Sequence, residues 1–198
     1  DQTGYFLEAR GSFIDSLYVS AGTRYTDNDD FGSKTTYRIG AAYVRKFGDG
    51  DIKLKSTYGT GFRAPSLSEI AFNQSPDAFP PAQGTELGAE ESKGWDAGIG
   101  YYASSGWYVD AVYFDQKIDD EIFFDLVNFS GYLQDDGESS SSGVEITSEI
   151  PIGELVTFTG NYTYTDTQDF EGEQRVRTPK NMGNLGILIS PWDGRLQF

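Results

Sequence analysis

The stretch "STYGTGFRAPSLSEI" (residues 56–70) decides the fold class of this chain. It lies at the end of an alternating, strand-like run, and after it no periodicity is visible until about residue 91. Gly59 and Gly61 add no side-chain packing to a strand, and Pro65 lacks the N–H that strand pairing requires. The stretch therefore predicts the end of a long β-strand, followed by a long loop.

Period-two alternation runs through most of the chain, whereas helical spacing is nearly absent. In residues 35–47, one face of the predicted strand holds Tyr37, Ile39, Ala41, Tyr43 and Phe47. The other face holds Arg38, Gly40, Ala42 and Lys46. Similar alternation marks residues 17–25, 95–102, 144–147 and 156–164. We expect about nine or ten strands of about 9–13 residues, longer than the usual strand of about 5–6 residues.

The connections between these strands are of two kinds, which alternate along the chain. Short ones occur at residues 14–16, 48–51, 104–106, 151–154 and 192–194. Long ones occur at about residues 27–34, 62–91, 118–141 and 166–179. Short periplasmic turns and long extracellular loops are typical of antiparallel transmembrane β-barrels. The pattern favours such a barrel, with its apolar face against outer-membrane lipid, over a soluble β-sandwich whose apolar face is a core.

Composition excludes several function classes. The chain has 15 Lys+Arg and 31 Asp+Glu, so 15 − 31 gives a net charge of −16, which argues against a nucleic-acid partner. Cysteine and histidine are absent, which removes disulfides, Ser-His-Asp triads and the usual zinc ligands. The chain contains no run of about 18 apolar residues, which is the length that would predict a membrane-spanning helix. We expect no enzyme activity and no cofactor.

The acidic segments offer only weak site signals. "DNDDFG" (residues 27–32) is similar to a Ca²⁺ loop, but Phe31 occupies a position that needs Asp or Asn. Asp135, Asp136 and Glu138 give the same weak signal, and Asp119, Asp120 and Glu121 could form an acid/base pair. We favour solvated loops and an outer strand end for these residues, and predict no metal site.

The opening stretch is similar to a sequence motif of a known protein family. "STYGTGFRAPSLSEI" resembles the barrel signature of TonB-dependent outer-membrane receptors, the transporters of siderophores, vitamin B12 and similar scarce ligands. Further phrases resemble the family in the same order: "LGAEESKGWD" (87–96), "AVYFDQKIDDEIFF" (111–124), "SSGVEITSEI" (141–150), "GNYTYTDTQ" (160–168) and "RVRTPKNMGNLGI" (175–187). Ala89 stands where the family usually has proline. The spacing is most similar to the vitamin B12 receptor branch.

The resemblance implies a place within a larger receptor. Such receptors have an N-terminal plug domain, which contacts TonB, and a barrel of about 22 strands. Nothing in this chain resembles the plug, and residues 196–198 only start a new strand. We therefore expect residues 1–198 to be part of a barrel domain, without plug and final strands, in the bacterial outer membrane.

The implied function is TonB-energised uptake of a small-molecule ligand, either a corrinoid or an iron chelate, with TonB acting through the absent plug. A porin that works without TonB and a soluble carbohydrate-binding β-sandwich remain the alternatives. Detergent dependence would separate the barrel from the sandwich, and a plug domain would separate the receptor from the porin.

The resemblance also implies roles for single residues. Architectural roles fall to the motif residues Tyr58, Gly59, Gly61, Phe62, Arg63, Pro65, Ser66, Leu87, Glu90, Gly143 and Glu145. Among these, Arg63 is expected to reach back to a carboxylate or to loop carbonyls and so order the loop base. Because loops on a rigid scaffold often carry recognition, ligand binding is assigned to loop aromatics: Phe79, Phe129 and Tyr132.

Overall fold

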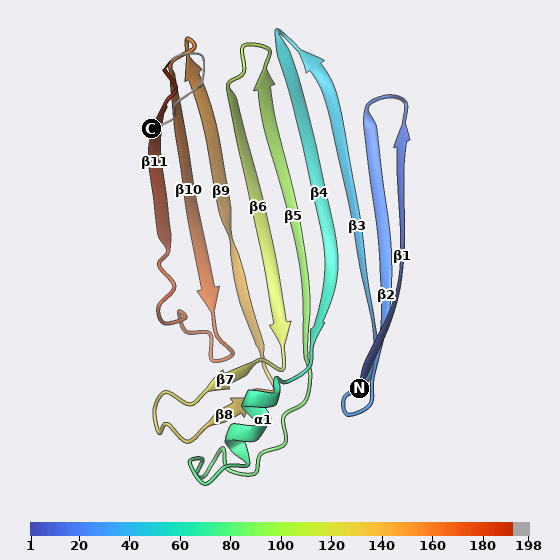
Figure 1. Cartoon of the computed structure of the whole chain (residues 1–198), viewed down its shortest axis with the longest axis vertical. Helices are drawn as coiled ribbons and strands as arrows, with labels where there is room; N and C mark the ends of the chain where they lie inside the picture. The colour runs from blue at the N-terminus through green and yellow to red at the C-terminus, as the bar shows by residue number, and fades with distance from the viewer. Residues whose placement is uncertain (192–198) are drawn as a thin grey trace.

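Nine long strands form one antiparallel sheet in the computed structural model, which describes residues 1–191 (Figure 1). Their spatial order is β1-β2-β3-β4-β5-β6-β9-β10-β11. The strands are β1 (Gln2–Phe13), β2 (Leu17–Asn28), β3 (Gly32–Phe47), β4 (Gly50–Arg63), β5 (Glu90–Ala103), β6 (Tyr108–Asp119), β9 (Glu138–Ile152), β10 (Val156–Gln168) and β11 (Asn181–Ile189). The turn predicted at residues 192–194 and the strand start at 196–198 lie outside the described residues.

Three shorter elements lie between the long strands. Helix α1 (Leu67–Asn73) follows β4, and strands β7 (Ile122–Phe124) and β8 (Tyr132–Gln134) form a small hairpin between β6 and β9. Within residues 1–191, no helix has the length and hydropathy needed to cross a membrane. The predicted all-β architecture is confirmed, and several strands are longer than expected, reaching 16 residues in β3.

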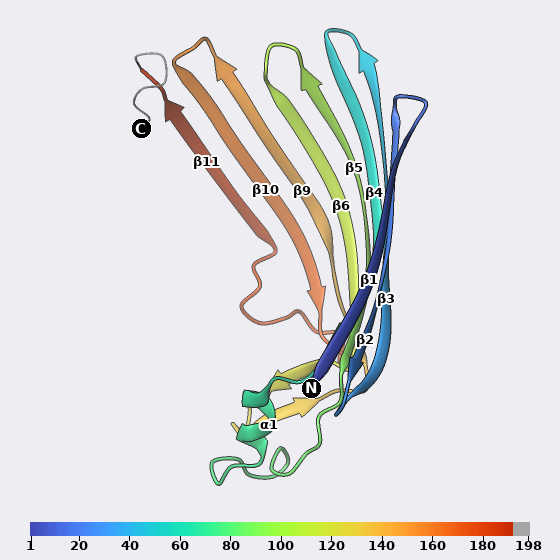
Figure 2. The same cartoon turned by 45° about the vertical axis from the view of Figure 1, so that its right-hand side comes forward.

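The sheet is curved (Figures 1 and 2). Helix α1 and the β7–β8 hairpin lie on the concave side. Glu90 of β5 points to that side, because its Oε1 accepts a 2.7 Å hydrogen bond from the Ile122 N–H at the start of β7. The concave face is therefore the face of Glu90, Asp96 and the other even-numbered residues of β5.

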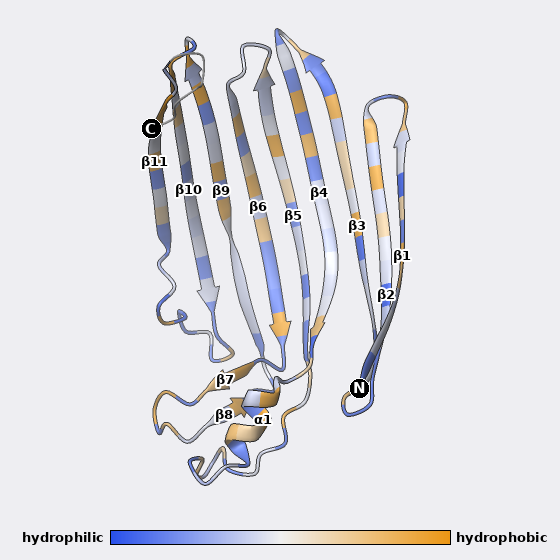
Figure 3. Ribbon diagram, viewed as in Figure 1, coloured by the Kyte–Doolittle hydropathy of each residue, from blue (hydrophilic) through white to orange (hydrophobic). Residues whose placement is uncertain are grey.

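The convex face is apolar. The register places Ile39 of β3 beside Ala21 of β2 and Tyr58 of β4, and Leu54 of β4 beside Tyr43 and Ile99. Hydrophobic and hydrophilic residues accordingly alternate along the strands (Figure 3). The two faces predicted for residues 35–47 are confirmed: a Cβ on Gly40 would lie beside the Ser20 and Thr57 hydroxyls, on the side opposite Ile39.

Aromatic side chains gather near both ends of the convex face. Near the loop end, the ring centroids of Tyr37 and Tyr58 lie 6.1 Å apart, and those of Trp95 and Tyr113 lie 5.2 Å apart. Near the turn end, Tyr101 and Trp107 are 5.1 Å apart. Amphipathic rings at two levels are the pattern of the interfacial girdles of membrane barrels.

The segregation of connections is confirmed with one correction. Short turns join the strands at one end, whereas residues 64–89, 120–137 and 169–180 form long connections at the other. The long loop expected at residues 27–34 is wrong, because β2 and β3 are joined by residues 29–31 alone. The Asn28 Oδ1 accepts hydrogen bonds from the N–H groups of Asp30 and Phe31, and Gly32 takes a φ of 73°. An Asx turn followed by a left-handed glycine reverses the chain here.

Candidate functional site

The long connections after β4 and β6 fold together into one structure, which we call the rim lobe (residues 64–89 and 120–137). Its helix begins at Ser66, whose Oγ accepts from the Glu69 N–H at 3.2 Å, while Glu69 Oε2 accepts from the Ser66 N–H at 2.6 Å. This capping box satisfies two N–H groups that a helix start leaves unpaired. The Ser-x-x-Glu spacing was visible in the sequence and could have predicted the helix.

Arg63 fastens the rim lobe to the ends of two strands. Its Nη2 donates to Glu90 Oε1 at 2.8 Å, and its Nε donates to Glu90 Oε2. Its Nη1 contacts both carboxylate oxygens of Glu69, at 3.1 and 3.2 Å. Glu90 also accepts from the Ile122 N–H, so one guanidinium connects β4, α1, β5 and β7. We call Arg63, Glu69 and Glu90 the rim clamp; it confirms that Arg63 reaches a carboxylate at the loop base.

Glu69 is held in its charged form. Partial burial disfavours ionisation, but hydrogen bonds from Ser66 and Arg63 outweigh it and hold the pKa of Glu69 below its ordinary value. The Glu69 carboxylate is therefore charged at neutral pH.

Two side-chain amides join the two halves of the rim lobe. Asn73 is 1% exposed, and its amide exchanges two hydrogen bonds with the Tyr132 backbone, at 2.7 and 2.8 Å. The Gln134 amide similarly accepts from the Gly88 N–H at 2.6 Å and donates to the Gly88 carbonyl at 3.2 Å. Because a buried amide is costly without partners, the Asn73 pair specifies how the two halves dock, and the more exposed Gln134 pair adds a second link. Asn73 and Gln134 were not predicted as site residues.

The predicted ligand-binding aromatics lie in the rim lobe but differ in exposure. Tyr132 packs edge-on against Phe72 and Phe124, with ring centroids 5.9 and 5.3 Å away. Phe129 is 62% exposed and Phe79 is 46% exposed. The Phe79 N–H donates to the carbonyl of Ser130, the residue after Phe129, at 3.1 Å. Tyr132 thus helps form the lobe's interior, while Phe79 and Phe129 present apolar surface.

The tip of the β7–β8 hairpin is ordered around Asp125. Its carboxylate accepts from the N–H groups of Val127 and Asn128, both at 3.0 Å, and from the Ser130 hydroxyl at 2.7 Å. The Asn128 and Ser130 hydrogen bonds lower the pKa of Asp125 to about 2. Phe129, with a φ of 58°, can hold its left-handed conformation because this network surrounds it.

The third long connection, residues 169–180, touches the rim lobe. The rings of Phe170 and Phe123 lie 5.5 Å apart, and Arg175 forms an ion pair with Glu121. The three long connections therefore make one contiguous assembly at the loop end of the sheet.

A cleft of about 1500 Å³, here called the rim cleft, separates the rim lobe from the start of β1 and from the β2–β3 turn. Its walls are Asp1, Gln2, Asn28, Asp30, Phe31, Phe62, Arg63, Ala64, Pro65, Leu67, Ile70, Gln74, Gly84, Thr85, Glu86, Leu87, Gly88 and Ala89. Four predicted motif residues, Phe62, Arg63, Pro65 and Leu87, thus border it. The volume exceeds the usual 300–1,000 Å³ of small-ligand pockets.

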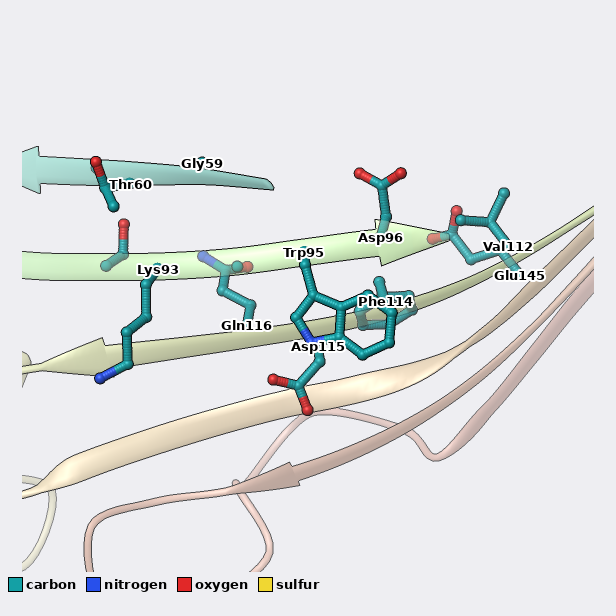
Figure 4. Close-up of a pocket in the computed structure, with 13 residues that line it drawn as sticks. Gly59, Thr60, Lys93, Trp95, Asp96, Val112, Phe114, Asp115, Gln116 and Glu145 are labelled. Carbon is teal, nitrogen blue, oxygen red and sulfur yellow. The ribbon is translucent and has the colours of Figure 1, made fainter. Parts of the chain in front are cut away.

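A second hollow, of about 620 Å³, lies on the sheet itself where β4, β5, β6 and β9 run side by side (Figure 4). Gly59, Gly61 and Gly94 border it, and Asp96 and Glu145 contribute carboxylates. Neither carboxylate forms an ion pair with any residue between 1 and 191. Among residues 1–191, these two carboxylates of the concave wall therefore have no cationic partner.

Close packing explains why position 143 requires glycine. A Cβ built there would collide with the Tyr164 carbonyl oxygen and the Phe114 ring. Gly59 has no such need, since a Cβ would make only ordinary contacts at 3.6 Å or more. Tyr58 faces the convex side, where its ring meets Tyr37.

The acidic segments do not form a metal-ligand cluster within residues 1–191. Asp119, Asp120 and Glu121 lie at the loop end of β6, as expected, and Asp119 forms an ion pair with Lys93 at 3.3 Å. Glu138 pairs with Lys93 and Lys117, at 3.2 and 2.5 Å. These carboxylates neutralise neighbouring lysines.

Sequence comparisons agree with this geometry. Two curated relatives are vitamin B12 transporters named BtuB. The one from Vibrio cholerae serotype O1 is 26% identical over 87% of this chain and 26% of the relative. The one from Photobacterium profundum is 27% identical over 97% of this chain and 31% of the relative. The chain thus spans 26% and 31% of the length of these relatives.

Solved structures share the fold at low identity. The ferric enterobactin receptor PfeA of Pseudomonas aeruginosa has a TM-score of 0.76 and 16% identity over 97% of this chain and 30% of its own. The ferripyoverdine receptor of the P. aeruginosa outer membrane has a TM-score of 0.70 and 15% identity over 96% and 26%. The family described as "TonB dependent receptor-like, beta-barrel" matches residues 1–198 throughout. The chain belongs to this family of bacterial outer-membrane receptors and forms part of the barrel.

Proposed function

We propose that this chain forms part of the wall and of the ligand-recognition surface of a receptor that takes up a scarce small molecule, a corrinoid or an iron chelate, with energy from TonB. The family match along the whole chain carries the proposal. The rim lobe supports it, because a loop assembly fixed by the rim clamp offers a preorganised binding surface, and preorganisation lowers the entropic cost of binding. The chain acts in binding and transport and has no catalytic role.

Outer-membrane lipid is the partner proposed for the convex face. Side chains such as Leu7, Ile39, Ile99 and Leu185 point outward there, and Leu185 is 94% exposed. Exposed apolar patches of this extent are not tolerated on soluble monomers. The same surface disfavours the soluble carbohydrate-binding sandwich, which would bury it in a core.

The partner proposed for the concave wall is a plug domain, through which TonB would act. The carboxylates of Asp96 and Glu145 border the wall hollow and have no cationic partner among residues 1–191. A plug that presents donors to this hollow would satisfy them. A porin without a plug would leave them facing water.

Shortening the rim lobe tests the proposed function. Asp119 and Glu138 are register partners in β6 and β9, so residues 120–137 can be replaced by Asn-Gly, which closes a tight hairpin. In the full-length receptor, we expect the barrel to assemble and uptake of labelled vitamin B12 or ferric enterobactin to be lost. Uptake is measured in cells with and without TonB.

The control variant is Glu154→Gln in the short turn between β9 and β10, at the opposite end of the sheet. It should leave uptake unchanged. Normal uptake by the shortened variant would refute recognition by the rim lobe, and equal uptake without TonB would refute energised transport.

A further inference from the structure

The rim cleft discriminates ligands by charge. We infer that it binds a bulky amphiphilic molecule without net negative charge, which presents amide or hydroxyl groups. This inference rests on the proposed function and narrows the ligand class.

The cations at the cleft wall are already paired. Arg63 is the only basic side chain among the residues that line the cleft, and it contacts both oxygens of Glu69 and both oxygens of Glu90. The terminal ammonium of Asp1 pairs with Asp29 at 2.9 Å. A ligand anion at Arg63 would have to displace one of these carboxylates. Charge-assisted, forked pairs of this kind are the strong ones.

The other charged walls repel anions. The side-chain carboxylates of Asp1, Asp30 and Glu86 line the cleft, and none of the three forms an ion pair with a basic side chain between residues 1 and 191. An anionic chelate would lie beside these carboxylates, and like charges placed together at a binding site oppose association. An uncharged or cationic ligand meets no such barrier.

The remaining walls suit an amphiphile. Phe31, Phe62 and Leu67 supply apolar surface, and Leu67 is 86% exposed although it lies in the first turn of α1. Gln74 and Thr85 supply side chains that can donate and accept hydrogen bonds. A volume of about 1500 Å³ accommodates a ligand larger than an ordinary metabolite.

Two probes of different charge test the inference on the purified full-length receptor. Cyanocobalamin is uncharged, large and rich in amides, whereas ferric enterobactin is an anion. We expect cyanocobalamin to bind at least about tenfold more tightly, a difference of about 1.4 kcal/mol. Its Kd should change little between low and high salt, because screening acts on charge pairs. Binding is measured by isothermal titration calorimetry.

Single-residue variants test whether the difference in affinity between the two probes arises in the rim cleft. Glu86→Lys should strengthen ferric enterobactin binding several-fold, and Glu86→Gln should do so less. Leu67→Asp should weaken cyanocobalamin binding, whereas Glu154→Lys at the opposite end of the sheet should change neither Kd. Barrel assembly of each variant is checked by heat-modifiable gel mobility.

Tighter binding of ferric enterobactin by the unmodified receptor would overturn the inference and leave the proposed function standing. Cyanocobalamin binding that Leu67→Asp does not affect would also overturn it. Failure of both probes to bind, together with no TonB-dependent uptake of either, would refute the proposed function as well.

Discussion

Arg63 shows how one side chain can hold a loop assembly on a barrel rim. Lysine keeps the charge but cannot present the planar fork that contacts Glu90 and Glu69 together. Because the Arg63 side chain is 45% exposed, solvent screening reduces the loss from Arg63→Lys to about 1 kcal/mol of rim-lobe stability. We expect faster hydrogen exchange at residues 66–73 and 122–134, with the barrel intact.

Arg45→Lys is the matched control, because Arg45 of β3 makes no ion pair within residues 1–191 and lies near the opposite end of the sheet. Equal exchange rates in the Arg63→Lys variant and the unmodified receptor would show that the rim clamp does not hold the lobe.

Neighbouring residues of one strand point to opposite faces of the sheet, and the two faces have different partners. Ile39 and Gly40 are neighbours on β3, but Ile39 points to the convex face and Gly40 to the concave one. Arginine on the lipid face near the bilayer midplane costs about 2–4 kcal/mol. We therefore expect Ile39→Arg to reduce barrel assembly far more than Gly40→Arg, as measured by heat-modifiable gel mobility of the full-length receptor.

Gly40→Arg serves as the internal control for added charge and size, since the side chain enters a polar wall beside Ser20 and Thr57. Equal assembly of both variants would contradict the assignment of the convex face to lipid.

The described part of the chain, residues 1–191, presents two strand edges and one wide apolar face. Within residues 1–191, β1 and β11 each pair on one side only. Unpaired edges promote association with other chains, and the nine strands form a curved sheet that does not close on itself (Figure 2). Residues 1–198 expressed alone should therefore aggregate in water and recover β structure only in detergent, as judged by size-exclusion chromatography and circular dichroism. A monomeric peak with a cooperative melt in water would contradict the open-wall architecture.

The sequence by itself determined the features that depend on near neighbours in the chain. Alternation assigns Tyr37, Ile39 and Tyr43 to one face, because successive side chains of a strand point to opposite sides. Pro65 marks the end of β4 for an equally local reason, the missing N–H. The acidic run around Asp29 was harder to interpret, since composition alone could not show that the Asn28 side chain would close a short turn.

Only the tertiary structure decided how the rim lobe is built. Arg63 was predicted to find a carboxylate, but its two partners, Glu69 and Glu90, are 6 and 27 residues away and could not be chosen among the 31 acidic residues by pattern. Asn73 and Tyr132 meet across 59 residues. The sequence pattern does not predict such contacts, because irregular segments have no repeating geometry. The contacts form where the curvature and register of the sheet bring strand ends together. Burial then favours the polar pairs that leave no group unsatisfied.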